Sequence, residues 1–506
     1  MEQTNLINST IRKNLGSVQS TVSTDLQAEN NIAKILCSKA SSAITNYEAL
    51  AGELRFSGTV CFCVTYTNEL GEFFTLQDSV SFNSKLENEN IGINTVPMFK
   101  SDVIELKVSS SSDEVKLNAT VETDVVGLIT DSVNYYVNNT ENIITNSNFV
   151  NYSTLASNGN LTFNFEENFE SKDKINKILF KNADVKILDY SLGTDYFTVE
   201  GIVTVNIGYE IGEENFELKH YTNCYKFKEE LEKDGITNDG YLLVNSMVSD
   251  CEIRAEIVTN EENSVVNMVI PINVNYAYIL PATSEVIVDA YSLKNKLNLN
   301  IESFKVDGKN ISKIFEEKID GQLIIDNEAP RIIKPVSFCS ENVTITNSFK
   351  DGDNLILEGV AGVNVIYLEE DENETLNSVI VEVPFSIENR VDDISLEDEI
   401  TACAIIKDVD VKCKKGKEIN IQLELCIKVN AFNSLEEMAL TNIVIGEELT
   451  PKEACLQIYF AKKGSSLWDI SKGLLSKPEQ ILDQNPNINL PLEADEKIVL
   501  FNHHDN

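Results

Sequence analysis

The chain contains a threefold internal repeat, and no other feature of the sequence restricts its fold as strongly. In each copy an apolar residue is followed two positions later by glycine, and a tyrosine lies eight positions after that glycine. The glycines and tyrosines are Gly58 and Tyr66, Gly201 and Tyr209, and Gly359 and Tyr367. An even spacing places both residues on the same side of a strand. A glycine inside a strand suggests a bulge or the close approach of another backbone.

The flanks of these segments repeat in the same order. An apolar pair opens a strand upstream of each glycine, and a short aromatic strand follows, with its phenylalanine 24 or 26 positions after the glycine. The apolar pairs are Ile35-Leu36, Ile178-Leu179 and Ile332-Ile333, and the phenylalanines are Phe82, Phe227 and Phe385. Each copy closes with two alternating strands around a polar turn such as SSSSD, which is typical of a hairpin.

Three all-β units therefore account for most of the chain, at residues 17–135, 161–292 and 318–432. Val, Ile, Thr, Asn and Phe recur in short alternating runs, which favour β-sandwich or barrel-like units. We expect Asn-rich connectors between the units, such as residues 137–148. The first two copies also share a closing motif, LITDSVN at Leu128–Asn134 and VIVDAYS at Val286–Ser292.

The net charge excludes two classes of partner. The chain has 81 acidic and 41 basic residues, a net charge of −40, which repels phosphate backbones and anionic lipids. We therefore expect no nucleic-acid partner. Residues 451–506 hold 6 lysines against 8 acidic residues, so almost all of the excess lies upstream. Two interpretations of the acidity are open. It serves only to keep a β-rich protein soluble, or the acidic part sets spacing and solubility while the near-neutral C-terminal segment docks on partners.

The cysteines and the chain start predict an intracellular protein. Cys61 and Cys63 would lie on one face of a strand, but the chain has no CxxC and only three histidines, so no metal site is predicted. We expect the ten cysteines to be buried, reduced thiols. The start lacks a secretory signal, and no apolar run reaches the ~18–20 residues of a membrane span. The sequence thus predicts a cytosolic location without direct membrane insertion.

Catalytic motifs are missing from the sequence. It contains no HExxH, GxSxG or GxxxxGK[ST], and with 81 carboxylates chance acidic pairs are inevitable. We therefore predict a non-enzymatic protein without a cofactor.

The order of these repeated elements resembles the SPOCS domain of clostridial spore-coat proteins. The segment Val383–Ser386, with the sequence VPFS, is the closest single match to that pattern. The resemblance covers about three quarters of the chain and implies three tandem SPOCS-like β domains.

The C-terminal segment reads as a separate strand–helix–helix–strand unit, at residues 454–502. Capping-box spacings at Ser466 with Asp469 and at Ser476 with Glu479 predict two helix starts, and Pro478 suits the first turn of the second helix. Apolar residues at helical spacing predict a small core on one face of the helices. These residues are Leu467, Ile470, Leu474, Ile481 and Leu482.

This unit resembles a LysM module. The family pattern is met at Gly464, Leu467, Ile470, Ile481 or Leu482, and Asn485. The usual Asp-Thr is replaced by Ser465-Ser466, the usual second-loop glycine by Ala494-Asp495-Glu496, and the closing proline by Phe501. A loop that has lost its glycine and gained two acids is less open to a sugar. The departures favour protein recognition over glycan binding.

The only tryptophan of the chain, Trp468, has two readings. It caps the small core, or it is a partly exposed anchor of a kind enriched at interfaces. Lys462 and Lys463 would supply a polar rim. The predicted partner-binding residues are Lys462, Lys463, Gly464, Ser465, Leu467, Trp468, Ile470 and Asn485.

Three SPOCS-like domains followed by a LysM module resemble the SipL class of spore-coat morphogenetic proteins. The resemblance implies synthesis in the mother-cell cytoplasm, recruitment to the forespore surface, and binding of the coat morphogenetic ATPase SpoIVA through the LysM module. Other coat proteins or a second copy are further expected partners. Two alternatives stay open: a peptidoglycan-binding LysM protein, and a self-assembling coat or exosporium structural protein.

Overall fold

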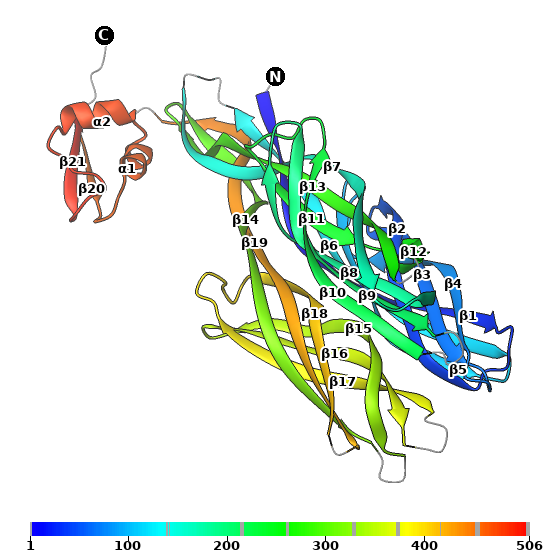
Figure 1. Cartoon of the computed structure of the whole chain (residues 1–506). Helices are drawn as coiled ribbons and strands as arrows, with labels where there is room; N and C mark the ends of the chain where they lie inside the picture. The colour runs from blue at the N-terminus through cyan, green and yellow to red at the C-terminus, as the bar shows by residue number, and fades with distance from the viewer. Residues whose placement is uncertain are drawn as a thin grey trace.

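The chain folds into three β lobes and a small C-terminal unit (Figure 1). The computed structural model describes residues 3–137, 140, 142–212, 217–259, 263–325, 330–370, 375–414, 416–450 and 456–501. Strands dominate these residues, which confirms the expectation of a mainly β protein.

Lobe 1 is formed by residues 3–137 and consists of two antiparallel three-stranded sheets packed face to face. The sheet orders are β1-β6-β5 and β2-β3-β4. The strands are β1 (Gln3–Gln27), β2 (Lys34–Leu50), β3 (Glu53–Thr67), β4 (Phe73–Glu87), β5 (Val96–Ser110) and β6 (Glu114–Val137).

Lobe 2, residues 143–292, repeats this plan with one extra strand. Its sheets are β10-β9-β8 and β11-β13-β12, with β7 also paired to β13. The elements are β7 (Ile143–Ser171), β8 (Ile175–Leu192), β9 (Tyr196–Ile211), β10 (Glu217–Glu232), β11 (Tyr241–Met247), the 3-10 turn η1 (Asp250–Glu252), β12 (Arg254–Thr259) and β13 (Ser264–Ser292).

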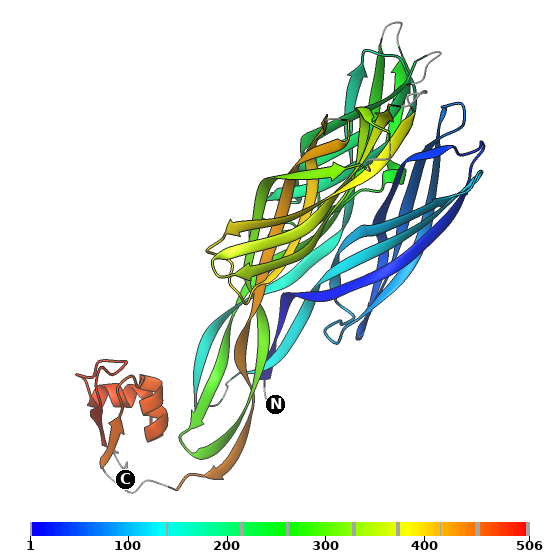
Figure 2. The same ribbon diagram turned by 90° about the horizontal axis from the view of Figure 1, so that it is seen from below.

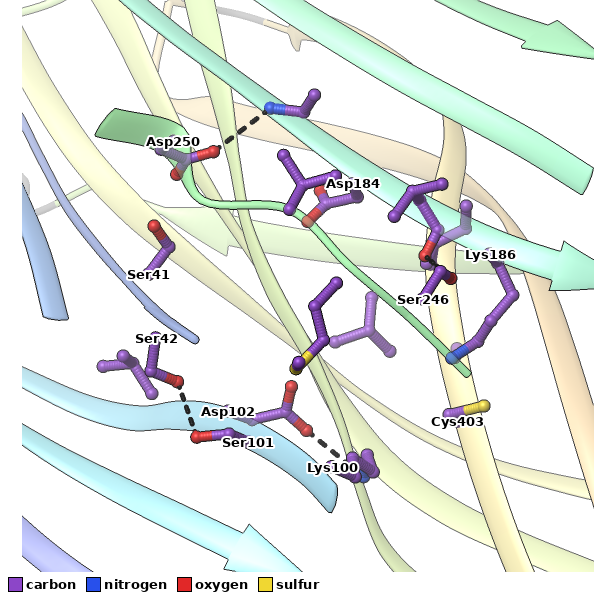
Figure 3. Close-up of a pocket in the computed structure, with 18 of the residues that line it drawn as sticks. Ser41, Ser42, Lys100, Ser101, Asp102, Asp184, Lys186, Ser246, Asp250 and Cys403 are labelled. Carbon is purple, nitrogen blue, oxygen red and sulfur yellow. Dashed lines mark hydrogen bonds and ion pairs between the residues drawn. The ribbon is translucent and has the colours of Figure 1, made fainter. Parts of the chain in front are cut away.

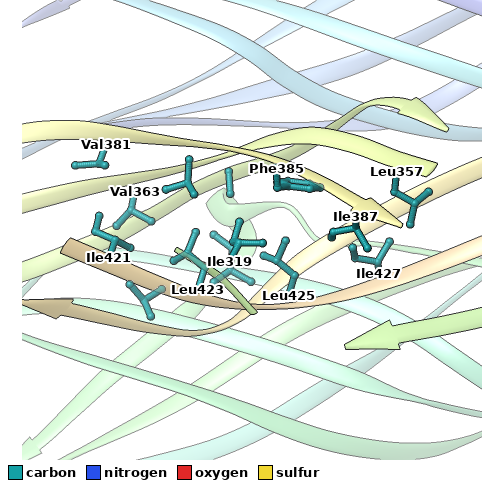
Figure 4. Packing of buried hydrophobic residues seen from close by; sticks show 14 of the residues in the cluster. Ile319, Leu357, Val363, Val381, Phe385, Ile387, Ile421, Leu423, Leu425 and Ile427 are labelled. Carbon is teal, nitrogen blue, oxygen red and sulfur yellow. The ribbon is translucent and has the colours of Figure 1, made fainter. Parts of the chain in front are cut away.

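Lobe 3, residues 295–448, again has two three-stranded sheets, β14-β19-β18 and β15-β16-β17. Its core lies between them, where Leu357, Val363 and Phe385 of one sheet face Ile421 and Leu425 of the other (Figure 4). The strands are β14 (Asn295–Ile324), β15 (Ile332–Asp351), β16 (Asn354–Glu369), β17 (Leu376–Arg390), β18 (Glu399–Lys414) and β19 (Glu418–Glu448).

The repeated glycines lie in the central strands β3, β9 and β16, each opposite the phenylalanine of the neighbouring strand. The register pairs Gly58 with Phe82, Gly201 with Phe227, and Gly359 with Phe385. A Cβ atom at Gly201 would lie 2.3 Å from the carbonyl oxygen of Lys186 and 2.6 Å from the Phe227 ring. The predicted close approach of another backbone is confirmed, and it explains why these positions carry glycine. The predicted closing hairpins are confirmed as β5–β6, β12–β13 and β18–β19.

The first strand of the repeat carries a β-bulge in every lobe, and the bulged residue points into the junction of the three lobes. In lobes 1 and 2 these residues are Leu36 and Leu179, both buried in one apolar cluster. In lobe 3 the bulge falls between Pro335 and Ser337, so Val336 takes this place. The pair Ile332-Ile333 does open β15 as expected, but it does not correspond to the pairs of lobes 1 and 2, because Ile332 packs in the core of lobe 3 and the junction position lies at Val336.

The bulged segments also accept hydrogen bonds in a ring that joins the lobes. The Thr75 hydroxyl of lobe 1 donates to the carbonyl of Leu179 in lobe 2 at 2.6 Å. His220 of lobe 2 hydrogen-bonds the backbone of Val336 in lobe 3. Ser378 of lobe 3 donates to the carbonyl of Ile35 in lobe 1 at 3.3 Å. Each lobe thus bonds the next, and the three copies close on themselves within one chain.

This ring predicts a pH effect at His220. Burial lowers the pKa of His220 below its ordinary 6.5, and the bond to Val336 only partly opposes this. The unfolded chain therefore binds the proton more tightly, so the stability of the junction is full above pH 6.5 and falls as the pH decreases toward the folded-state pKa. An NMR titration of the His220 ring is expected to give a midpoint below 6.5, and His220→Gln removes this part of the pH dependence. A midpoint at or above 6.5 contradicts the prediction.

The longest strands run beyond the expected domain limits and form a stalk. β1, β7 and β14 begin at Gln3, Ile143 and Asn295, well before positions 17, 161 and 318. Residues 143–148, expected as a connector, form the start of β7 and pair with β13. The three ribbons β1–β6, β7–β13 and β14–β19 share an apolar core at this end (Figure 2). The stalk core contains Ile7, Val133, Tyr135, Val150, Val286, Phe304, Val306 and Ala439.

A disulfide links lobe 1 to lobe 2. Cys61 of β3 is bonded to Cys251 of η1, with 5.9 Å between the Cα atoms. The expectation of reduced thiols is therefore wrong for this pair. The two residues are 190 positions apart, and only the packing of the lobes brings them together.

Candidate functional site: the C-terminal module

The C-terminal module, residues 456–501, has its own small core. It consists of β20 (Leu456–Ala461), α1 (Leu467–Leu474), α2 (Pro478–Gln484) and β21 (Glu496–Phe501), with the two strands paired antiparallel. Its buried apolar residues are Ala461, Ile470, Leu474, Ile481, Leu492, Ile498 and Leu500. In Figures 1 and 2 the module lies at the stalk end of the molecule, near the N-terminus.

The helix starts confirm one predicted cap and correct the other. At α1 the Ser466 hydroxyl accepts the amide of Asp469, and the Asp469 carboxylate accepts the amide of Ser466, which is a full capping box. The hydrogen bonds to Ser466 hold the pKa of Asp469 below its ordinary value, and burial, which would raise this pKa, has a smaller effect. At α2 the N-cap is Lys477, not Ser476, and Pro478 begins the helix.

The backbone polar groups of the loop after β20 form hydrogen bonds within the module. Gly464 adopts φ +86°, a conformation that favours glycine. Its amide donates to the carbonyl of Leu492, and the amide of Leu492 donates to the carbonyl of Ser465. The amide of Lys463 donates to Asp495 at 2.8 Å. The two loops that a LysM module would offer to glycan are therefore bonded to each other, with the side chains of Lys462 and Lys463 exposed at their rim.

Three predicted site residues hold the module together instead of facing outward. Ile470 is fully buried, and Leu467 packs partly buried beside it. The Asn485 side chain donates to the carbonyls of Ile481 and Val499 and accepts the amide of Val499. These contacts tie α2 to the outer edge of β21. Leu482, expected in the core, is 41% exposed.

Trp468 contacts lobe 2, an arrangement that neither reading of the sequence anticipates. Its indole Nε1 donates to the Asp289 carboxylate at 2.8 Å. Its ring lies 5.1 Å from that of Tyr291, centroid to centroid. Lys472, one turn later on α1, donates to both oxygens of Asp289 at 2.6 Å. Residues of β13 and α1 thus meet across 179 positions of sequence.

The outer face of the β20–β21 sheet is an exposed apolar surface that the sequence analysis missed. Leu456, Ile458 and Phe460 are 45, 47 and 73% exposed, and Phe501, opposite Leu456, is 56% exposed. The ammonium of Lys497 lies 5.5 Å from the Phe460 ring. We call this surface the apolar sheet face. The alternation of Leu456, Ile458 and Phe460 predicts one apolar face of the strand. Tyr459 and Ala461 give the opposite face an apolar character as well, so the pattern does not tell which face is buried.

A second candidate is the cavity of about 150 Å³ at the junction of the three lobes (Figure 3). Burial lowers the pKa of Lys39 there, but the carboxylates of Asp184 and Asp250 outweigh it, so this pKa lies above its ordinary value. Lys100 pairs with Asp102 at 3.2 Å. Lysines and aspartates are balanced around the cavity, so its charges join the lobes and favour neither a cationic nor an anionic ligand.

The described residues lack two further kinds of functional feature. Among them no helix is long and apolar enough to cross a membrane. Within the same part of the chain, no group of three or more His, Cys, Asp or Glu is placed to hold a metal ion.

Residues 174–256 match the family described as SipL, SPOCS domain. The matched segment lies in lobe 2 and extends from β8 to the start of β12, including the glycine strand β9. The match supports a SipL-type, sporulation- and coat-related protein. No curated protein and no solved structure matches the chain.

Proposed function

We propose that this chain is a non-enzymatic spore-coat assembly protein that binds a SpoIVA-like coat morphogenetic ATPase through its C-terminal module. The observation that carries the proposal is the SipL SPOCS match at residues 174–256. In this proposal the protein acts in the mother-cell cytoplasm, where it is recruited to the forespore surface and helps to encase it. The repeated lobes then serve as a scaffold that places the module and offers contacts to other coat proteins.

The surface of the module supports protein recognition. The apolar sheet face offers large side chains beside the ammonium of Lys497, and exposed apolar patches of this kind mark docking sites. Lys462 and Lys463 follow directly on β20 with exposed side chains, and α1 begins at Leu467. We therefore propose that the partner spans the apolar sheet face and the start of α1.

Glycan is a weaker candidate ligand for the same module. The two loops bond to each other through Gly464, Leu492 and Ser465, and Asp495 accepts the amide of Lys463. A sugar chain entering between them would first have to break these bonds, which lowers its net gain from new ones.

The test is a binding titration of the full chain against the purified coat ATPase and, separately, against purified peptidoglycan. Phe460→Glu places a charge in the apolar sheet face and is expected to weaken ATPase binding about thirtyfold, as at a central hot spot. The matched control is Leu396→Glu, because Leu396 is 74% exposed in lobe 3 and its substitution is expected to leave binding unchanged. Binding to peptidoglycan alone, or equal weakening by both variants, would contradict the proposal.

A further inference from the structure

The contact between α1 and the end of β13 has the character of a docking site built for this chain's own module. We propose that Asp289 and Tyr291 form a docking surface for the C-terminal module, and that docking withholds Trp468 from an external partner until the module is released. The second half rests on the proposed function. The first half depends only on the described contacts.

The geometry is specific. Asp289 accepts three hydrogen bonds from the module, one from the Trp468 indole and two from the Lys472 ammonium, and a fourth from the amide of Ala290, so both carboxylate oxygens are used. The Tyr291 hydroxyl donates to the carbonyl of Ser476 at 2.6 Å. Tyr291 and Ser476 are both buried, and burial raises the pKa of Tyr291 to about 12. A tilted aromatic contact, a charged pair and a buried hydroxyl therefore converge on one strand end.

The repeat gives independent support. Asp289 belongs to the closing motif Val286–Ser292, and the same position of the first copy, in Leu128–Asn134, is Asp131. Asp131 accepts the backbone amide of Lys305 in lobe 3 at 2.8 Å. In both copies this aspartate binds a later part of the chain. In lobe 2 the later part is the module.

The contact is suited to reversible release. Lys472 and Asp289 remain 42 and 25% exposed at their side chains, so solvent and salt screen the pair. Docking lowers the apparent affinity of any partner that needs Trp468, because that affinity is proportional to the undocked fraction. Loosening the contact should then strengthen partner binding, which is opposite to the effect of damaging a binding surface.

The first measurement uses the full chain and its only tryptophan, which makes Trp468 a direct reporter. We expect Asp289→Asn to shift Trp468 emission to the red and to raise its quenching by acrylamide, while the thermal unfolding of the lobes stays unchanged. Tyr291→Phe, which removes the hydroxyl that bonds to Ser476 and Ser471, should give a smaller change in the same direction. Glu285→Gln, an exposed carboxylate on the same strand, should give none. Unchanged quenching in Asp289→Asn overturns the docking surface.

The second measurement titrates the same variants with the purified coat ATPase. Asp289→Asn is expected to bind about tenfold more tightly than the original chain, within the usual range of coupling between sites, and Glu285→Gln identically to it. If quenching rises but the ATPase affinity of Asp289→Asn does not, docking stands and occlusion of the partner is overturned. If the ATPase binds no variant, the proposed function fails, and the fluorescence result still decides whether the module docks.

Discussion

Gly201→Ala is expected to lower the stability of lobe 2 by about 3 kcal/mol, at the upper end of the range for overpacking a core. The added methyl group would lie 2.3 Å from the carbonyl oxygen of Lys186, in the neighbouring strand β8, and 2.6 Å from the Phe227 ring. The Phe227 ring is held by its neighbours in the packed sheet and has little room to move away. The Lys186 carbonyl belongs to a strand whose backbone is already bent by a bulge between Ile187 and Asp189. Relief therefore requires the two strands to separate.

Calorimetry of the full chain checks this result as a lowered first unfolding transition. The control is Gly92→Ala, because a Cβ atom at Gly92 would meet only the Thr95 hydroxyl, at 4.0 Å. We expect that variant to unfold as the original chain does. Gly58→Ala and Gly359→Ala should reproduce the Gly201 effect in lobes 1 and 3. A Gly201→Ala chain as stable as the Gly92→Ala chain would show that the phenylalanine and the bulge yield without cost.

Ile470→Arg is expected to unfold the C-terminal module while leaving the three lobes intact. Ile470 is completely buried in a core of only seven buried apolar residues. An unpaired charge in such a position costs about 4 kcal/mol, and a unit this small has little stability to lose. Binding to the coat ATPase should disappear with the fold, so this loss alone says nothing about the contact surface.

The matched control is Ile458→Arg, the same substitution on the apolar sheet face, where Ile458 is 47% exposed. It should keep the module folded, with Trp468 emission unchanged, and still weaken ATPase binding. Circular dichroism of the lobes and fluorescence of Trp468 separate the two effects. A folded Ile470→Arg module would refute the assignment of this side chain to the core. An Ile458→Arg chain with undiminished binding would remove the apolar sheet face from the interface.

Much of the lobe architecture follows from local sequence. The glycine, tyrosine and phenylalanine spacing identifies three strand pairs because each residue type has a steric reason for its place. Gly201 admits the Lys186 carbonyl, and Phe227 fills the space above it. The capping box at Ser466 is similarly local, since both partners lie within one turn.

What the sequence could not predict depends on contacts between distant segments. The bulge that brings Val336 into the junction shifts the register by an amount that no pattern of apolar pairs encodes. The disulfide of Cys61 requires lobe 2 to be in place. The contact of Trp468 with β13 likewise needs Asp289 and Tyr291, far away in the chain. Both faces of β20 are apolar enough to be buried, so only the position of the helices decides that Phe460 faces outward.

The shared core of the stalk has a consequence for synthesis on the ribosome. Ile7 emerges roughly 430 residues before Ala439, which completes the same cluster. At about 5–20 residues per second this interval is on the order of 20 to 90 seconds. During this interval the apolar stalk residues of β1 and β6 lack the later strands that cover them in the folded chain. A nascent chain of this kind is expected to need shielding at one end while its first lobe is already folded.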